Sequence, residues 1–425
     1  KFSNIINTDF MAQYKCKSAG IIGAGIQGVC TGLQLIKKGI PVTIFDKNEP
    51  GSMTSYGNAG HFSPYAVLQL NRPDIIYDIP KMLFTSYGPL ALKWNYIPKM
   101  LPWILKYLKS STKKSMMHTA KYMHQILNLS LDAYDDLFKE IDTSNLVERK
   151  GIIYIWTNKN KKSRDLEIKV RDQLGVKQKI LNQKEILDLE PNLSPVFDAG
   201  AFYDYAYHAR DPHGILIKLF ELFLKKGGKF IKSEVKNLKQ TDKDKTEITT
   251  SETKYSFEKI VLACGAFSKK FTDELGENIP LDTERGYHVH FENMDHLISR
   301  PVIFLDRGFG MTPMNQGLRA VGTVELGGLK NPLSKKRIDY ILRCSKELLP
   351  QLKNHKDEWL GFRPTLPDFL PVIGPSSKFK NIIYSFGHQH LGWTLGAITG
   401  KIVSGIVSGE NTNLDLQPYS SKRFN

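Results

Sequence analysis

Short apolar runs alternate with amphipathic stretches along the chain, and this pattern predicts an α/β protein. The apolar run at residues 19–22 is typical of a buried parallel strand. Leu33 and Ile36 continue an apolar face that predicts a helix over residues 26–38, and residues 41–45 are expected to form a second strand. The chain therefore opens with a predicted βαβ unit.

The later segments repeat these two periodicities with long interruptions. Residues 71–146 are predicted to be mostly helical, and residues 169–189 are predicted to form a charged, exposed helix and loop. An amphipathic helix is expected at residues 212–226, and one more runs from the last strand to about residue 409. Strands are expected at residues 151–156, through Val235, at 259–263 and at 382–386, and a β-rich region over 287–326 has expected turns at Gly308, Gly310 and Gly317.

This order of elements predicts two discontinuous domains. A Rossmann-like domain is expected from residues 18–70, 196–275 and 352–415, and a second domain of mixed or antiparallel sheet plus helices is expected from residues 71–195 and 276–351. Residues 1–17 and 416–425 are interpreted as terminal extensions. Ligands of open α/β sheets lie beyond the carboxyl ends of the strands, so Gly23, Gly265 and Gly387 are expected to approach one ligand.

The first turn carries a dinucleotide motif. Gly23, Gly25 and Gly28 match G-x-G-x-x-G, in which the glycines permit a tight turn, a close approach to a pyrophosphate and close packing of helix on strand. The N–H groups that open the helix would face the phosphates. Asp46 ends the second strand, where an acid accepts the ribose hydroxyls and disfavours the 2′-phosphate of NADP. These residues leave NAD and FAD open.

The composition gives the chain a large positive net charge. The 425 residues are 41% hydrophobic and 24% charged, as in an ordinary globular enzyme, with a formal net charge of +16. A lysine-rich solvated surface is the simplest explanation, and an anionic membrane, an acidic redox partner or nucleic acid are alternatives. Residues 89–114 mix Trp94, Trp103 and leucines with lysines, so they are expected either to cap a pocket or to lie flat on a bilayer.

Other features bear on the cellular location. Cys16, Cys30, Cys264 and Cys344 form no C-x-x-C pair, which fits a reducing compartment and gives no zinc motif. The sequence has no uninterrupted apolar run of about 18 residues that would predict a membrane-spanning helix. Its first ten residues lack the apolar core of a secretory signal. We therefore expect a cytoplasmic protein without a metal, with peripheral contact to the inner face of the cytoplasmic membrane as the alternative.

Four stretches resemble the D-amino-acid oxidase superfamily of FAD enzymes. They are the glycine motif through Asp46, MTSYGNAGHFSP (53–64), KIVLACGAFS (259–268), and the pair GFRPTLPDFLPVIG (361–374) and YSFGHQHLGWTLGAITGK (384–401). The last pair looks closest to bacterial D-amino acid dehydrogenases of the small-subunit type. PLDTERGYHV (280–289) favours the subgroup that acts on D-amino acids and on D-proline or hydroxyproline.

The resemblance implies FAD as the cofactor and oxidation of a D-amino acid or a cyclic amino acid. Hydride would pass from the substrate Cα to flavin N5 and leave an imino acid, and electrons would go on to a quinone, an electron-transfer protein or O2. A glycine- or sarcosine-type amine oxidase is the alternative. A flavin enzyme that modifies tRNA is disfavoured because no additional nucleic-acid-binding module is visible, so no nucleic-acid partner is expected. A non-catalytic FAD-binding scaffold is disfavoured because it would need no carboxylate clamp.

The resemblance also implies site residues. Arg363 is the expected clamp for the substrate carboxylate, with a structural ion pair as its alternative role and Arg285 as a substitute cation. His390 is expected to touch substrate or flavin, and Tyr287 and His288 are expected to line the pocket or bond the carboxylate, although each of the three could instead be a core residue.

The residues expected to bind FAD come from every matched stretch. Gly57 stands where some relatives carry a histidine bonded to flavin, so FAD is expected to be non-covalent. The expected contacts are Gly23, Gly25, Ile26, Gln27, Gly28, Asp46, Lys47, Thr54, Ser55, Ala59, Gly60, His61, Val235, Gly265, His388, Gln389, Gly392, Trp393 and Thr394.

Overall fold

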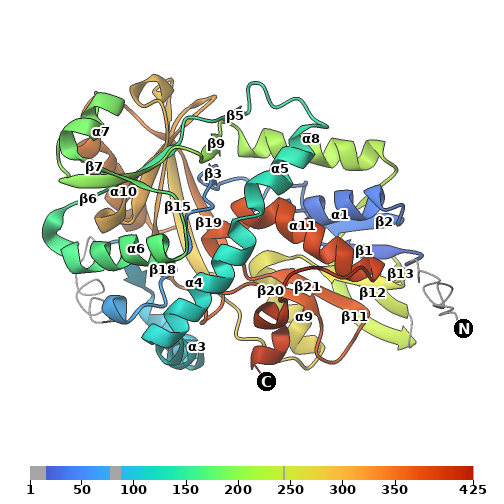
Figure 1. Cartoon of the computed structure of the whole chain (residues 1–425). Coiled ribbons are helices and arrows are strands. Elements are labelled where there is room, and N and C mark those ends of the chain that lie inside the picture. Colours follow the sequence, from blue (N-terminus) through green and yellow to red (C-terminus); the bar gives the residue numbers. More distant parts are fainter. Residues whose placement is uncertain (1–15, 77–87, 243–244, 425) are drawn as a thin grey trace, which may run out of the picture.

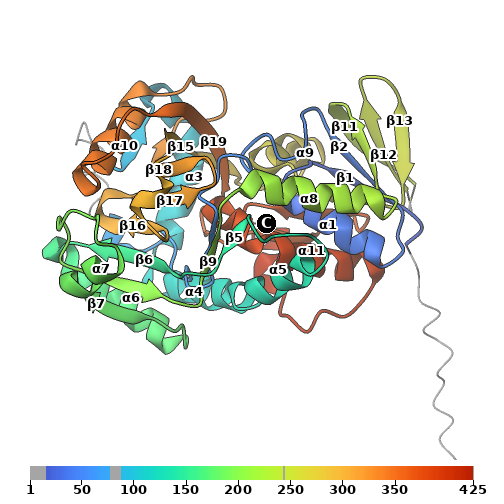
Figure 2. The same ribbon diagram turned by 90° about the horizontal axis from the view of Figure 1, so that it is seen from above.

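Two sheets organise the protein, whose computed structural model describes residues 16–76, 88–242 and 245–424. Figure 1 shows the smaller sheet on the right and the larger sheet on the left, with the helices α4 (Lys113–Leu127) and α5 (Ser130–Phe138) crossing in front of them. Seen from above in Figure 2, the two halves lie side by side. The α/β fold class is thereby confirmed.

The smaller sheet has six strands in the order β10-β2-β1-β14-β21-β20. Five of them run parallel, and β20 is antiparallel to β21. These strands come from three separated parts of the chain, as expected: β1 (Ala19–Ile22), β2 (Val42–Asp46), β10 (Lys229–Lys232), β14 (Lys259–Leu262), β20 (Val372–Pro375) and β21 (Ile382–Phe386).

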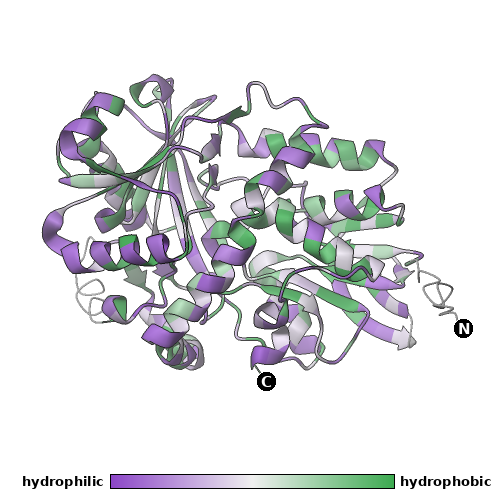
Figure 3. Cartoon of the chain, viewed as in Figure 1, coloured by the Kyte–Doolittle hydropathy of each residue, from purple (hydrophilic) through white to green (hydrophobic). Residues whose placement is uncertain are grey.

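Both faces of this sheet are covered, which explains why its central strands are apolar throughout. On one face α1 (Ile26–Lys37) packs against both α8 (Pro212–Lys225) and α11 (Gly392–Ser408). On the other face lies a three-stranded sheet of β11 (Val235–Asp242), β12 (Lys245–Thr250) and β13 (Lys254–Phe257), which shares a buried apolar cluster with the six-stranded sheet. Figure 3 shows a hydrophobic and a hydrophilic side on α8, as expected for a surface helix.

The larger sheet has nine strands. Eight of them follow the order β19-β15-β18-β17-β16-β6-β8-β7, and the ninth, β4, pairs with β18. The helix α10 (Lys335–Leu348) packs on β15, β17 and β18. The strands are β4 (Leu90–Leu92), β6 (Ile152–Trp156), β7 (Lys179–Asn182), β8 (Ala199–Tyr203), β15 (Asp282–Glu292), β16 (Val302–Phe304), β17 (Phe309–Met314), β18 (Gly317–Leu326) and β19 (Lys356–Thr365).

Several further elements lie outside the two large sheets. The strands β3 (His61–Phe62), β9 (Tyr207–Ala209) and β5 (Val147–Glu148) form a small antiparallel sheet. The helix α3 (Ile97–Ser110) lies at the lower edge of the molecule in Figure 1, and α9 (Ser268–Glu274) follows the loop after β14.

Strongly periodic segments were predicted to within about two residues, and weakly periodic ones were not. The prediction of a helix and loop over residues 169–189 is wrong: α6 (Lys161–Gln173) begins earlier, the edge strand β7 follows it, and α7 (Gln183–Leu189) comes next. No side chain of β7 is buried, so no alternation marks the strand. Gly310 lies inside β17 rather than in a turn, and the helix α10 was not anticipated.

The domain boundaries stay a prediction, but two of them cut across the sheets. The strands β8 and β19 belong to the nine-stranded sheet, although their residues were assigned to the Rossmann-like domain. Residues 416–424 do not extend from the body, because Tyr419 is fully buried and Arg423 pairs with Asp368. Residues 1–15 lie outside the described part of the chain.

One helical stretch, Gln389–Ser408, is long and apolar enough to cross a membrane by length and composition, but 78% of it is buried inside the protein. It consists of η6 (Gln389–Leu391) and α11 and packs against α1 and α5. This helix is therefore a core element of the six-stranded half.

Candidate functional site

A cavity of about 920 Å³ lies between the two sheets. Its walls include residues that follow the carboxyl ends of β1, β2, β14 and β21, together with the facing strands β15 to β19 of the larger sheet. A parallel sheet places such strand ends at one edge, which is where open α/β sheets hold ligands. Of the three glycines expected there, Gly23 and Gly265 line the cavity. Gly387 does not, but its neighbours Phe386 and His388 do.

The first turn of α1 opens onto this cavity. Gly25, Ile26 and Gln27 line it, and the Ile26 N–H donates to Ser55 Oγ at 3.1 Å. Gly28 lies behind the wall, where a Cβ atom would stand 1.9 Å from the carbonyl oxygen of Gly23. Gly28 therefore serves the close packing of α1 on β1 and makes no contact with the cavity.

The acid at the end of β2 is held by two backbone bonds. Asp46 Oδ2 accepts from the Ala24 N–H at 2.9 Å, and Oδ1 accepts from the Asn48 N–H at 2.9 Å. Each carboxylate oxygen keeps a further lone pair for ribose hydroxyls, since a carboxylate accepts about four hydrogen bonds. Lys47, Val235 and Gly265 line the same end of the cavity, as expected for the adenosine part of a dinucleotide.

The loop before β3 forms a second wall. Thr54 Oγ1 donates to the Phe362 carbonyl of β19 at 3.0 Å, which ties this loop to the larger sheet. Thr312 Oγ1 donates to the Ala59 carbonyl at 3.0 Å and lies 2.7 Å from His61 Nε2. Burial lowers the pKa of His61 to about 3, so its ring is neutral. Ser55, Ala59 and His61 line the cavity, whereas Gly60 lies behind it.

The turn between β21 and α11 supplies a third wall. His388, Gln389, Gly392 and Trp393 line the cavity there. His388 Nε2 lies 3.1 Å from Thr399 Oγ1 of α11, so the ring of His388 also braces the turn. Thr394 does not reach the cavity; its hydroxyl donates to the His61 carbonyl at 3.1 Å.

Three buried polar atoms on these walls fit the FAD that the sequence predicts. Within the described residues, Gln27 Oε1, Gln389 Oε1 and Trp393 Nε1 have no hydrogen-bond partner. Leaving a buried polar atom unpaired costs about 1–3 kcal/mol, so such atoms on a cavity wall indicate a polar ligand. The acceptor of Gln27 in the first turn of α1, and the acceptor of Gln389 and donor of Trp393 at the start of α11, match a dinucleotide, which offers both N–H or O–H donors and acceptor oxygens.

Gly57 is enclosed by an aromatic side chain. A Cβ atom at this position would stand 2.3 Å from the indole of Trp359, so no larger residue fits without moving that ring. The His288 ring stacks on the Trp359 ring, with 4.9 Å between the ring centroids. Nδ1 of His288 lies 3.1 Å from the Gly57 carbonyl oxygen. His288 is thus a buried supporting residue behind the wall, which is the alternative role that the sequence left open for it.

Arg363 enters the cavity from β19. Its Nη1 donates to the Thr323 carbonyl at 2.9 Å, and its guanidinium packs over Gly286, where a Cβ atom would stand 2.3 Å from Nη2. Thr323 has a φ of 61°, and the β15–β18 register shifts beside it. A β-branched residue in this left-handed region is strained, and such strain is concentrated at functional sites. The bulge turns the Thr323 carbonyl toward Arg363 and orients the guanidinium.

Arg363 forms no ion pair within the described residues. The geometry therefore does not support its alternative role as a structural ion-pair partner. Arg285, the substitute cation, is fully buried and lies with Nη1 3.2 Å from Glu325 Oε1, outside the cavity wall. Tyr287 lines the cavity, but its hydroxyl donates to Glu325 Oε1 at 2.7 Å. The His390 side chain is exposed to the cavity, and loss of bulk water between the cavity walls, together with the nearby Arg363, lowers the pKa of His390 to about 4.

A buried carboxyl group stands beside the clamp. Glu284 is paired in register with Arg363 across β15 and β19, and its Oε2 atom has no hydrogen-bond partner in the described part of the chain. Burial raises the pKa of Glu284 to about 7, and the opposing effect of the Arg363 charge is smaller. Its charge therefore changes near neutral pH.

We predict that Glu284 makes substrate binding depend on pH. Below its pKa of about 7 Glu284 is neutral, and above that pKa its negative charge opposes the carboxylate bound at Arg363. KM should therefore rise between about pH 6 and about pH 8, by up to about tenfold, and Glu284→Gln should remove this rise. The measurement is KM against pH for the wild type and the variant. Glu292→Gln, an exposed change on the same strand, should keep the wild-type profile; identical profiles for E284Q and wild type would contradict the prediction.

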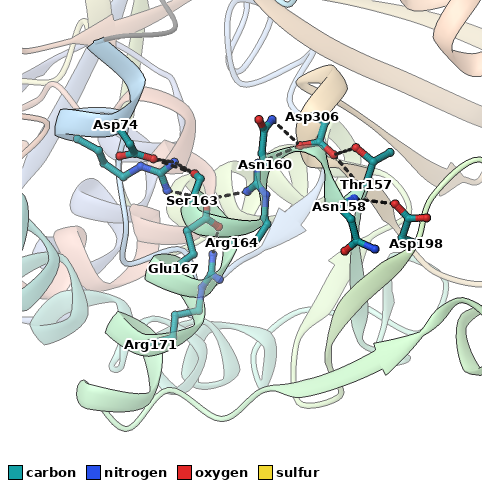
Figure 4. Close-up of polar contacts among 11 residues, drawn as sticks. Asp74, Thr157, Asn158, Asn160, Ser163, Arg164, Glu167, Arg171, Asp198 and Asp306 are labelled. Carbon is teal, nitrogen blue, oxygen red and sulfur yellow. Dashed lines mark hydrogen bonds and ion pairs between the residues drawn. The ribbon is translucent and has the colours of Figure 1, made fainter.

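A network of charged residues forms part of the cavity wall, and Figure 4 shows its polar contacts. Arg72 and Arg164 each donate to Glu167 Oε1 at 2.6 Å, and Arg171 donates to Oε2 at 3.1 Å. These three guanidinium groups lower the pKa of Glu167 to about 2 against the effect of burial. Asp74 accepts from Arg72, and Asp306 lies beside Arg164, so the network joins the segment near residue 74 to α6 and the larger sheet.

Several wall residues were missed from the sequence. Thr323, Glu284 and Trp359 reach or support the clamp only because β15, β18 and β19 pair side by side, and no local pattern marks them. Arg72 lies at the start of a stretch that was predicted to be mostly helical, and no element was predicted over Arg164 and Glu167. A buried ion network leaves no signal in a linear sequence, because charged residues are usually exposed.

Comparison with known proteins gives one family over most of the chain. The sequence model of the family described as FAD dependent oxidoreductase matches residues 19–406. The D-amino-acid oxidase of Bradyrhizobium diazoefficiens is 33% identical over 416 residues, which are 96% of this chain and 99% of that protein. The D-amino acid dehydrogenase of Vibrio atlanticus is 26% identical over 413 residues, covering 95% of this chain and 99% of that one.

Solved structures share the fold. Glycine oxidase from Geobacillus kaustophilus superimposes with a TM-score of 0.73 at 19% identity, covering 95% of this chain and 98% of that one. L-proline dehydrogenase from P.horikoshii gives a TM-score of 0.74 at 16% identity, with 96% and 98% covered. At these identities the likeness concerns the fold alone.

Proposed function

Because this chain belongs to the family of FAD-dependent oxidoreductases, we propose that it oxidises a D-amino acid at the bond between Cα and nitrogen. FAD is the cofactor, and its non-covalent attachment is part of the proposal. The observation that carries the substrate class is Arg363, a cation on the cavity wall with one donor engaged by a carbonyl and no carboxylate partner among the described residues. A carboxylate of the substrate supplies that partner.

Binding at Arg363 orients the reacting carbon. A guanidinium forms two parallel hydrogen bonds to a carboxylate, which hold the plane of the group as well as its charge. The Thr323 carbonyl holds the guanidinium from behind, and Gly286 leaves room for it. With the carboxylate fixed, Cα is confined to a small region of the cavity, and this positioning supplies much of the rate.

The amine has to be neutral when the substrate reacts. His390 on the cavity wall has a pKa of about 4, so it is neutral at physiological pH and can accept a hydrogen bond from the amine. The positive charge of Arg363 also disfavours a second cation nearby. These residues therefore favour the neutral amine without a dedicated catalytic base.

Bound FAD would supply the redox chemistry by accepting a hydride from Cα. The chain would contribute donors to the negative charge of the reduced cofactor, and the backbone N–H groups of the turn from His388 to Trp393 at the start of α11 would supply them. Water would then hydrolyse the imino acid: an acyclic one gives a 2-oxo acid and ammonia, whereas the cyclic imine of a proline-type substrate opens to an amino-2-oxo acid that keeps its nitrogen.

The D-configuration is proposed from the relatives, which are a D-amino-acid oxidase and a D-amino acid dehydrogenase. Among D-amino acids we favour a cyclic one, D-proline or cis-hydroxy-D-proline, on the resemblance of residues 280–289 to enzymes of that subgroup. The proposed electron acceptor is a quinone, an electron-transfer protein or O2, and the proposed location is the cytoplasm.

Turnover with an artificial acceptor dye tests this proposal. The panel is D-proline, cis-hydroxy-D-proline, other D-amino acids, their L-enantiomers, glycine and sarcosine. We expect one D-amino acid to be preferred over its L-enantiomer by about 100-fold or more in kcat/KM. Turnover of glycine or sarcosine in its place would assign a glycine-oxidase-type reaction, and preference for an L-enantiomer would overturn the stereochemistry.

A further inference from the structure

The helix α3 has a buried face that fastens it to the protein. Met100, Trp103 and Tyr107 are buried there and pack against Phe369. Trp103 Nε1 donates to the Thr365 carbonyl at 3.3 Å, and the Tyr107 hydroxyl donates to the Leu70 carbonyl at 2.9 Å. These contacts lie behind the cavity wall, and no residue of α3 lines the cavity itself. The helix is therefore held rigidly with its other face outward.

The outward face of α3 is apolar. Leu101, Leu105 and Leu108 have exposed fractions of 50%, 53% and 42%, and Trp94, just before the helix, is 66% exposed. Positions spaced by four and then three residues share one side of a helix, so the three leucines form a continuous row that we call the leucine stripe. Four of the ten large exposed apolar side chains in the described residues gather on this one short segment. Single exposed apolar residues are ordinary, whereas such a cluster indicates a contact surface.

Lysines accompany the leucine stripe. Between Asp78 and Asp132 the sequence has eight lysines and no acidic residue. Lys99, Lys109, Lys113 and Lys114 are exposed, and none of these four forms an ion pair within the described residues. This short segment thus carries about half of the formal net charge of +16 of the chain.

We propose that Trp94 and α3 dock the enzyme on an anionic membrane surface. The leucine stripe would enter the boundary between headgroups and acyl chains, Trp94 would lie at the headgroup level, and the lysines would contact lipid phosphates. A helix with an apolar outer row and a basic rim is the arrangement that interfacial helices share. The inference is independent of which amino acid the enzyme oxidises.

Charge argues against the other occupants of this surface. A symmetric dimer through α3 would bring two sets of lysines together, and like charges across an interface are unfavourable. A nucleic acid would engage the lysines but would leave the leucine stripe in water. An anionic bilayer satisfies both features, and two weak signals of this kind act together to give stable attachment.

Vesicle flotation of the full-length FAD-loaded enzyme tests the proposal. The probes are vesicles of phosphatidylcholine alone and of phosphatidylcholine with phosphatidylglycerol. We expect binding to the anionic vesicles, weaker binding as salt is raised, and little binding to the neutral ones. Trp94 emission should shift to shorter wavelength on binding, and this shift should be missing from Trp94→Phe.

Matched variants make the test decisive. The double variant L101S/L105S should bind the anionic vesicles at least about tenfold more weakly and should turn over soluble substrate with an artificial dye like the wild type. The control I180S/L224S alters two equally exposed apolar residues elsewhere and should bind like the wild type. Equal vesicle binding by L101S/L105S and wild type, or no binding to anionic vesicles, would overturn the proposal. A wild-type dimer that L101S/L105S converts to a monomer would instead assign the surface to a second copy of the chain.

Discussion

Replacing Arg363 by alanine should lower kcat/KM for the amino acid about 1,000-fold, or about 4 kcal/mol, because a buried carboxylate would lose its charged partner. Arg363→Lys should recover only part of the loss, since an ammonium group cannot form the two parallel bonds of a guanidinium. The measurement is steady-state kinetics with an artificial acceptor. The visible flavin spectrum of each variant shows whether the cofactor site has survived.

A matched change elsewhere serves as the control. Arg149 is 55% exposed and pairs with Asp135 on the surface, so Arg149→Ala should leave kcat/KM unchanged. If Arg363→Ala kept both its flavin and its kcat/KM, Arg363 would not be the carboxylate clamp. If the variant lost its flavin, Arg363→Lys would carry the comparison, because it retains the charge and most of the volume.

Replacing Gly28 by alanine should abolish FAD binding. The added Cβ would stand 1.9 Å from the Gly23 carbonyl oxygen, and a backbone atom cannot move aside as a side chain does. Helix α1 would have to shift away from β1, and its first N–H groups would leave their place at the phosphates. The measurement is the flavin content of the purified protein, from the ratio of visible to ultraviolet absorbance.

Gly32 on the same helix provides the control for this variant. A Cβ atom there would meet the side chains of Ile44 and Phe223 at 3.0 and 3.1 Å, and side-chain atoms can adjust by a few tenths of an ångström. Gly32→Ala should therefore keep its FAD. Full flavin content in Gly28→Ala would contradict the assignment of this turn to the pyrophosphate.

The cofactor side of the site could be predicted from sequence because its signals are local. Strand, glycine turn, helix, strand and acid follow one another within residues 19–46, and each has its own pattern. The C-terminal strand β21 and helix α11 were predicted from local patterns in the same way. Their meeting at one sheet edge then followed from the general behaviour of parallel strands.

The substrate side could be predicted only in part. Arg363 was identified from its motif, but its carbonyl anchor at Thr323 and its neighbour Glu284 depend on pairing between strands that are about 40 to 80 residues apart in the chain. Which of Tyr287 and His288 reaches the cavity depends on the register shifts that interrupt β15 on either side of them, and no local pattern marks these shifts. The structure places Tyr287 on the cavity side and His288 behind it.

The proposed function requires that this cavity bring an amino acid, held at Arg363, to bound FAD. The most direct measurement is the visible spectrum of the purified enzyme under anaerobic conditions, before and after addition of the D-amino acids. We expect an oxidised-flavin spectrum that bleaches with at least one of them, and far slower bleaching in Arg363→Ala at the same substrate concentration. A flavin spectrum that no amino acid bleaches would contradict the proposed substrate class, and a protein that binds no FAD would contradict the proposed function as a whole.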